Sequence, residues 1–179
     1  MRLIVVGAGG LGRVVGESII RLGLHELAGF VDDGPRRPAA MPPGPLLGGS
    51  GELAGLRDRH GVEGAVIAVA SAQARLALAA KAIAAGMALP AIVDATAVVS
   101  ASASVAEGAV ISAAAVVGPG AKIARLAIVN TAAVIEHDAV LEEACYVGPR
   151  SLIDARAVVP AGQAVPGGTV VGQDCRAGG

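Results

Sequence analysis

The half of the chain that follows residue 91 repeats a six-residue pattern, and this repeat restricts the fold more than any other feature. The second position of each hexad, from residue 93 to residue 171, holds Val, Ile or Leu in fourteen of fourteen cases. Four residues further on, most hexads have Ala, and the other occupants are Cys145, Ser151, Gln163, Thr169 and Cys175. A period of six differs from the 3.6 of an amphipathic helix and from the 2 of an alternating strand. Each repeat therefore predicts a short strand followed by a turn.

Such a unit cannot bury its apolar side alone, but stacked copies can. The aliphatic column would fill the interior of a prism, and the small column would let the chain turn a tight corner. Each buried aliphatic side chain contributes about 1.5–3 kcal/mol, which suffices for a stable core in a chain with one Phe and one Tyr. The pattern is typical of the hexapeptide class of parallel β-helix, although the spacing alone does not determine its handedness.

Composition limits the number of domains, the kind of partner and the location that we expect for the protein. A length of 179 residues, 54% of them hydrophobic, allows two cores, so we expect domains over 1–90 and 91–179. A net charge of -1 argues against a nucleic-acid partner. No apolar run reaches the 18 to 20 residues of a membrane span, and residues 1–7 look like a strand and not a secretory signal, so we expect a cytoplasmic protein without membrane insertion.

The two cysteines, Cys145 and Cys175, both occupy the small inward position of a hexad. This position predicts small core residues and makes a covalent acyl-cysteine mechanism unfavourable. Neither a disulfide framework nor the spacing of a metal site is present in the sequence.

The first ninety residues alternate strand and helix patterns, which indicates a Rossmann-like α/β domain. In chain order we expect a strand over 2–7, a helix over 11–22, a strand over 27–31, an irregular loop over 34–49, a helix capped by Ser50 and ending at 59, a strand over 64–70, and a helix capped by Ser71 and ending at 85. Residues 89–93 then lead into the prism.

A G-x-G-x-x-G motif, Gly7 to Gly12, lies between the first strand and the first helix. It predicts backbone N–H groups at a helix N-terminus, where a phosphate can bind. Asp32 and Asp33 follow about 20 residues later, where a ribose hydroxyl is usually bound. The alternative is that the glycines serve only a tight turn and close packing. A full NAD site needs two nucleotide-binding halves, and one is present, so a nucleotide-sugar site fits better than NAD.

Three histidines are candidates for acid–base chemistry. His25 and His60 have no motif around them, and the end of a helix is an ordinary place for His60. His137 lies in the turn half of its hexad between Glu136 and Asp138, with its side chain expected outside the prism. A flanking carboxylate can orient the imidazole and raise its basicity, which favours a general base. A solvated polar turn is the alternative.

Four motifs in order resemble the NeuD-type sugar acyltransferases, the sialic acid O-acetyltransferase group that also includes bacterial UDP-4-amino-sugar N-acetyltransferases. The motifs are 7–13, 29–33, 130–131 and 136–138. The resemblance implies a left-handed parallel β-helix after the Rossmann-like domain, a homotrimer, a nucleotide-sugar acceptor held by the N-terminal domain, and acetyl-CoA in the groove between neighbouring prisms, with no metal.

The resemblance also implies roles for single residues. By position, His137 is the general base, Asp138 its orienting carboxylate, Gly9, Gly10, Arg13, Asp32, Asp33 and Asn130 are acceptor contacts, and Tyr146 and Ala155 are coenzyme contacts. We therefore expect direct acetyl transfer from acetyl-CoA to a sugar or a nucleotide-linked amino sugar, on oxygen or nitrogen, with backbone N–H groups stabilising the oxyanion.

The chain departs from the family pattern in three places. The family often has His where this chain has Leu11 and Tyr146, and the prism continues for only about two coils after His137. The short prism and Tyr146 favour the alternative of a non-catalytic trimeric protein that binds a nucleotide sugar or acts as a scaffold.

Overall fold

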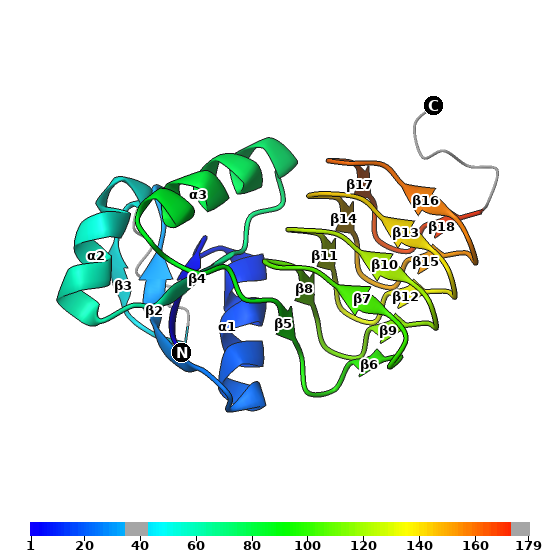
Figure 1. Cartoon of the computed structure of the whole chain (residues 1–179), viewed down its shortest axis with the longest axis horizontal. Helices are drawn as coiled ribbons and strands as arrows, with labels where there is room; N and C mark the ends of the chain where they lie inside the picture. Colours follow the sequence, from blue (N-terminus) through cyan, green and yellow to red (C-terminus); the bar gives the residue numbers. More distant parts are fainter. Residues whose placement is uncertain (35–42, 173–179) are drawn as a thin grey trace. The chain divides into compact units, whose positions relative to one another are not determined.

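The computed structural model describes residues 1–34 and 43–172, and the chain forms two compact units, Met1–Pro90 and Ala91–Gly179 (Figure 1). Each unit has its own apolar core. None of the helices in the described residues is long and apolar enough to cross a membrane.

The first unit is a four-stranded parallel sheet with helices. Its elements are β1 (Arg2–Val6), α1 (Gly10–Leu22), β2 (Glu26–Val31), β3 (Leu46–Gly48), the 3₁₀ helix η1 (Ser50–Glu52), α2 (Leu53–His60), β4 (Gly64–Ile67) and α3 (Ala72–Ala84). The strand order is β3-β2-β1-β4. The chain thus extends the sheet on one side of β1 and then crosses to the other, and the carboxyl ends of the strands share one edge, where open α/β sheets bind ligands.

Most elements of this unit lie where the sequence predicts them, and the exceptions depend on tertiary contacts. β3 forms inside the segment expected to be an irregular loop, because Leu46 pairs with Phe30 of β2. Residues 35–42 of that loop lie outside the described residues. β4 ends at Ile67, three residues earlier than expected. The expected cap at Ser71 is confirmed, since its hydroxyl accepts the N–H of Ala74.

The expected cap at Ser50 is wrong. Gly49 is the N-cap residue of η1 and Glu52 that of α2. Ser50 is the first residue of η1, and its hydroxyl instead accepts a hydrogen bond from Nζ of Lys81 at 3.2 Å.

The second unit is a parallel β-helix of two-residue strands, as the hexads predict, and it is left-handed, as the family resemblance implies. The strands are β5 (Ile92–Val93), β6 (Val98–Val99), β7 (Ser104–Val105), β8 (Val110–Ile111), β9 (Val116–Val117), β10 (Lys122–Ile123), β11 (Ile128–Val129), β12 (Val134–Ile135), β13 (Val140–Leu141), β14 (Tyr146–Val147), β15 (Leu152–Ile153), β16 (Val158–Val159), β17 (Ala164–Val165) and β18 (Val170–Val171).

Each prism strand from β5 to β15 pairs with the strand eighteen residues further on, so three hexads make one coil. The strands form three parallel sheets, which we name after one member each (Figure 1). The β11 sheet is β5-β8-β11-β14-β17, the β12 sheet is β6-β9-β12-β15-β18, and the β13 sheet is β7-β10-β13-β16.

The core of the prism consists of the two columns that the repeat predicts. Ile111, Ile135 and Ile153 of the aliphatic column are fully buried, and so are Ala133 and Cys145 of the small column. Cys145 therefore packs as a small core residue. The other cysteine, Cys175, lies outside the described residues.

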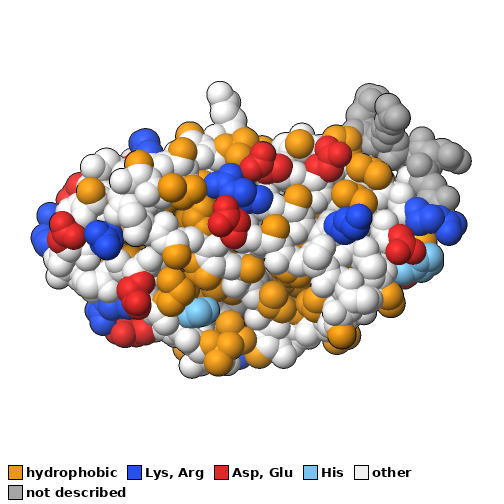
Figure 2. All heavy atoms as spheres, in the orientation of Figure 1, with side chains coloured by type: hydrophobic (Ala, Val, Ile, Leu, Met, Phe, Trp, Pro, Cys, Tyr) orange, Lys and Arg blue, Asp and Glu red, His pale blue; other side chains and the backbone are white. Residues whose placement is uncertain are grey.

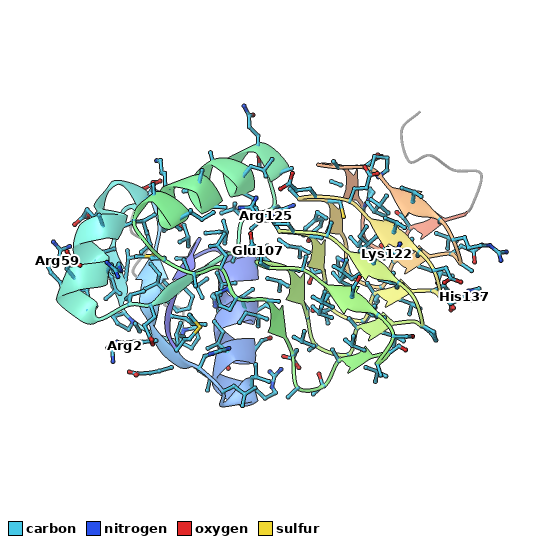
Figure 3. The ribbon with its side chains drawn as sticks, in the orientation of Figure 1. Arg2, Arg59, Glu107, Lys122, Arg125 and His137 are labelled. Carbon is cyan, nitrogen blue, oxygen red and sulfur yellow. The ribbon has the colours of Figure 1, made fainter. Side chains whose placement is uncertain are left out.

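An ion-pair ladder ties three successive coils together at one edge of the prism. Nε of Arg125 donates to Glu107 one coil before it at 2.7 Å (Figure 3), and Nη1 donates to Glu143 one coil after it at 3.0 Å. These hydrogen bonds, first to Glu107 and then to Glu143, raise the pKa of Arg125 above its ordinary value.

Candidate active site

His137 lies in the turn between β12 and β13, at one edge of the prism, and its side chain projects away from the core (Figure 3). Its Nδ1 is 2.9 Å from Oδ2 of Asp138, and the two side chains are 47% and 60% exposed. An ionised carboxylate only accepts hydrogen bonds, so in the neutral imidazole the proton lies on Nδ1. Nε2 then carries the free lone pair, as a general base requires.

The backbone of this turn is fixed from the coils on both sides. The N–H of Asp138 donates to the carbonyl of Pro119 in the preceding coil at 2.9 Å, and the carbonyl of His137 accepts the N–H of Arg156 from the following coil at 3.1 Å. Asp138 has a φ of 59°, a left-handed conformation that Asp tolerates better than most residues. The turn therefore holds the imidazole and carboxylate side by side.

Two glycines in the preceding coil provide space for this turn, and sequence reasoning missed them. A Cβ on Gly118 would lie 2.8 Å from the backbone nitrogen of His137, and one on Gly120 would lie 2.5 Å from Oδ1 of Asp138. The signal was available in the sequence, because 118–120 precedes 136–138 by one coil of eighteen residues.

Asn130 and Tyr146 form a second polar pair. Nδ2 of Asn130 donates to Oη of Tyr146 at 2.6 Å, and Oδ1 of Asn130 accepts the N–H of Thr131 at 2.7 Å. Both side chains of the pair are half-buried.

The structure does not bring the two pairs together within one chain. Asn130 lies in the turn before β12, whereas His137 lies in the turn after it, so the pairs occupy opposite edges of the β12 sheet. Ala155 occupies the turn one coil after His137, in the same column, and its N–H donates to Oδ1 of Asp154 at 2.8 Å.

In the first unit, the fold requires some glycines of the Gly7–Gly12 turn but not others. A Cβ on Gly12 would lie 1.8 Å from the carbonyl oxygen of Gly7, so packing explains this glycine. Gly9 and Gly10, at the start of α1, are exposed and would have open space around an added Cβ. Packing therefore does not explain why these two positions hold glycine. Glycine is expected there if a ligand approaches the backbone closely. Arg13 lies exposed in the first turn of the same helix.

The two aspartates follow β2 at the carboxyl edge of the sheet, and they are held differently. Oδ2 of Asp32 accepts the N–H of Ala8 at 2.6 Å and Oδ1 accepts the N–H of Gly34 at 2.7 Å, so this carboxylate braces the glycine turn. Asp33 is exposed, and its Oδ1 accepts the N–H of Ser50 at 2.6 Å.

The hydrogen bonds from Ser50, first from its side chain and then from its backbone, lower the pKa of Asp33, and the charge of Lys81 acts in the same direction. Sequence reasoning missed Ser50 and Lys81 as neighbours of the predicted nucleotide site, because no local sequence pattern relates residues from three separate elements.

The described residues contain no group of three or more His, Cys, Asp or Glu that could hold a metal ion. On the face shown in Figure 2, acidic and basic side chains are interspersed among hydrophobic ones.

Comparison with known proteins identifies the family. Residues 2–82 match the PglD N-terminal domain family. None of the curated proteins matches the chain. Among solved structures, the acetyltransferase domain of PglB from Neisseria gonorrhoeae, in complex with acetyl coenzyme A, is 31% identical, with a TM-score of 0.77 over 96% of this chain and 84% of that one.

Two further structures extend the likeness. A mutant of GDP-perosamine N-acetyltransferase from Caulobacter crescentus, with one histidine replaced by alanine and in complex with CoA and GDP-perosamine, is 32% identical, with a TM-score of 0.80 over 97% of this chain and 84% of that one. WeeI from Acinetobacter baumannii, at 18% identity and a TM-score of 0.66 over 97% and 90% of the two chains, shares the fold. The chain therefore belongs to the family of hexapeptide-repeat sugar N-acetyltransferases, with a PglD N-terminal domain over residues 2–82.

Proposed function

We propose that this acyltransferase moves the acetyl group of acetyl-CoA to the amino group of a nucleotide-linked amino sugar, with His137 as the general base. The observation that carries the proposal is the His137–Asp138 pair, which leaves Nε2 free at an exposed edge of the prism. The Neisseria and Caulobacter relatives, both acetyltransferases whose structures are complexes with acetyl-CoA or CoA, support this choice of donor. A reaction that consumes acetyl-CoA also fits a cytoplasmic protein.

The reaction needs one base and no acyl-enzyme. As the amine nitrogen attacks the thioester carbon, Nε2 of His137 takes its proton, and Asp138 stabilises the imidazolium that forms. The tetrahedral intermediate then collapses, the carbon–sulfur bond breaks, and the imidazolium returns the proton to the thiolate of CoA. Backbone N–H groups or other donors must stabilise the oxyanion in between.

We place the nucleotide of the acceptor at the carboxyl edge of the first unit. Gly9 and Gly10 expose backbone N–H groups at the N-terminus of α1 for a diphosphate, with Arg13 as a neighbouring cation. Asp33 would accept hydrogen bonds from the nucleoside, while Asp32 keeps the glycine turn in place. Asn130, which lies on the prism, would be a further contact to the acceptor. The GDP-perosamine bound by the Caulobacter relative supports a nucleotide sugar as acceptor.

A homotrimer is part of the proposal, because the β12 sheet carries an apolar outer face. Its outward residues are Val98, Val116, Val134, Leu152 and Val170. Val98, Val116 and Val170 are 65%, 38% and 66% exposed in the single chain. A column of five aliphatic side chains on a flat sheet favours burial against another copy.

Threefold symmetry about an axis facing the β12 sheet would also complete the site. The His137 edge of one prism would then meet the Asn130–Tyr146 edge of the next, because these edges flank the same sheet. Acetyl-CoA would lie in the groove between them, in contact with Tyr146 and Ala155. Each trimer would contain three identical sites.

The test is release of CoA thiol from acetyl-CoA, with UDP-4-amino-sugar and GDP-perosamine as acceptors, across pH 6 to 9. His137→Ala should lower kcat by roughly 10²–10⁴-fold, the typical contribution of a general base. Its thermal stability should match that of the wild type, because the exposed imidazole makes few packing contacts. His60→Ala, which removes a histidine at the end of α2, is the matched control and should stay active.

The rival is a non-catalytic protein that binds a nucleotide sugar, and Tyr146 in place of the family histidine favours it. Calorimetry separates the two candidates. Nucleotide-sugar binding without acetyl-CoA binding or thiol release would support the rival and remove the enzymatic proposal. A His137→Ala protein that keeps more than about a tenth of the wild-type kcat would instead show that His137 is not the general base.

A further inference from the structure

The hydrogen bonds of Asn130 fix which way its amide points. Oδ1 accepts the N–H of Thr131 at 2.7 Å and its hydroxyl at 3.3 Å. The backbone N–H can only donate, so the atom that faces it must be the amide oxygen. The NH₂ group therefore faces Oη of Tyr146, at 2.6 Å.

This orientation determines the role of the phenol. The NH₂ group of Asn130 has no acceptor capacity, so Oη of Tyr146 is the acceptor in this contact and keeps its own proton for another partner. Tyr146 is the first residue of β14, where side chains point out of the prism, and it is half-buried. The pair thus presents a neutral O–H donor whose direction is fixed by a neighbouring amide.

We propose that Tyr146, oriented by Asn130, donates a hydrogen bond to the thioester carbonyl oxygen of the acyl donor and stabilises the oxyanion that forms on attack. The inference rests on the proposed function, and it makes Tyr146 a catalytic residue and Asn130 its positioning residue. Negative charge develops on that oxygen as the amine adds, and a donor already in place strengthens as the charge grows.

The division of the groups between two edges is consistent with these roles. His137 must take a proton while Tyr146 must keep one, and in the proposed trimer the amine and the thioester would lie between the base of one chain and the phenol of the next. The turns at the two ends of β12 separate the groups in each chain. The proton balance is unchanged, because Tyr146 keeps its proton throughout.

Tyr146→Phe is the first test, because it retains the ring and removes the hydroxyl. We expect kcat to fall by roughly 10²–10³-fold, as when one oxyanion donor is removed. Affinity for S-ethyl-CoA, a thioether without the carbonyl oxygen, should stay within about twofold of the wild type, since the lost bond is made only to that oxygen. A structural role for Tyr146 would instead weaken binding of the analogue together with turnover.

Asn130→Asp tests the positioning role with the phenol still present. Its carboxylate can still accept the N–H of Thr131, but it has no N–H to donate to Oη of Tyr146. It would instead accept a hydrogen bond from the phenolic O–H, which would then not be available to the thioester. We expect a loss of kcat similar to that of Tyr146→Phe, and a double variant no slower than either single one, because both changes remove the same hydrogen bond.

The outcomes separate this inference from the proposed function. A wild-type protein that releases no thiol overturns both. An active wild type whose Tyr146→Phe variant keeps more than about a tenth of kcat overturns the role of Tyr146 alone. Additive losses in the double variant overturn the orienting role of Asn130.

Discussion

The fifth residue of each hexad adopts a left-handed backbone conformation over most of the prism, whatever its side chain. The positive φ recurs every sixth residue from Gly108 to Gly168 and includes Leu126 at 59° and Arg156 at 62°. Local preference would place Gly or Asn there, because other residues pay about 1–2 kcal/mol for this conformation. From Ala114 onward the N–H of this residue donates to the coil before it, as Asp138 does to Pro119, and stacking thereby imposes the conformation.

Gly120→Ala should separate activity from stability at this position. Gly120 has a φ of 70°, and an added Cβ would lie 2.5 Å from Oδ1 of Asp138, so the carboxylate must move away from its present position. We expect a loss of stability of about 1–2 kcal/mol from the backbone conformation. We also expect kcat to fall by about tenfold or more, because the imidazole loses its orienting partner.

Gly168→Ala is the matched control. Its φ is 72°, and nothing lies within 4 Å of the added Cβ, so it carries the same conformational cost without touching the His137–Asp138 pair. Urea denaturation and thiol release are measured for both variants. Equal activity of the two would show that the position of Asp138 does not matter for catalysis.

At the scale of elements, the sequence predicts the prism far better than it predicts the polar contacts. Each strand of the prism follows a local rule that repeats fourteen times, so errors in one hexad are corrected by its neighbours. β3 has no such pattern and forms because β2 offers a free edge. The Asn130–Tyr146 bond and the Asp32–Ala8 bond join residues 16 and 24 positions apart. Local patterns carry no information about such contacts.

The Glu107–Arg125–Glu143 ladder should contribute modestly to stability. Arg125→Met should lower the free energy of unfolding by about 1 kcal/mol, because partly exposed ion pairs contribute about 0–1 kcal/mol each. The contribution is present wherever the guanidinium is charged, and because the hydrogen bonds to Glu107 and Glu143 raise the pKa of Arg125, it is lost only at a pH above the ordinary arginine pKa. Lys122→Met, which removes an exposed cation from the neighbouring strand, should have less effect.

Salt and acid distinguish this ladder from a packing effect. The difference between Arg125→Met and the wild type should shrink in 1 M salt, where charges are screened within about 3 Å. It should also shrink as the pH falls far enough to protonate Glu107 and Glu143. A difference that stays constant under both conditions would indicate that the stem of Arg125, and not its charge, stabilises the coils.

At the scale of the whole molecule, the proposed trimer depends on the outer face of the β12 sheet. Val116→Asp places a carboxylate on that face, where it costs little in a single solvated chain but would be desolvated between prisms. We expect a folded protein that light scattering finds monomeric and that releases no thiol. Val158→Asp is the control, since Val158 is similarly exposed, at 40% against 38%, but points out from the β13 sheet. A trimeric Val116→Asp protein would contradict the assignment of this face.

Mixed trimers test whether each site uses two chains. His137→Ala retains Tyr146, and Tyr146→Phe retains His137, so neither variant alone contains an intact site. In a ring where the base of one chain meets the phenol of the next, every mixed trimer regains one intact site of three. Random exchange of equal amounts makes three quarters of the trimers mixed, so unfolding and refolding the two variants together should restore about a quarter of the wild-type activity. Sites contained within single chains would restore none, since no chain in the mixture carries both groups.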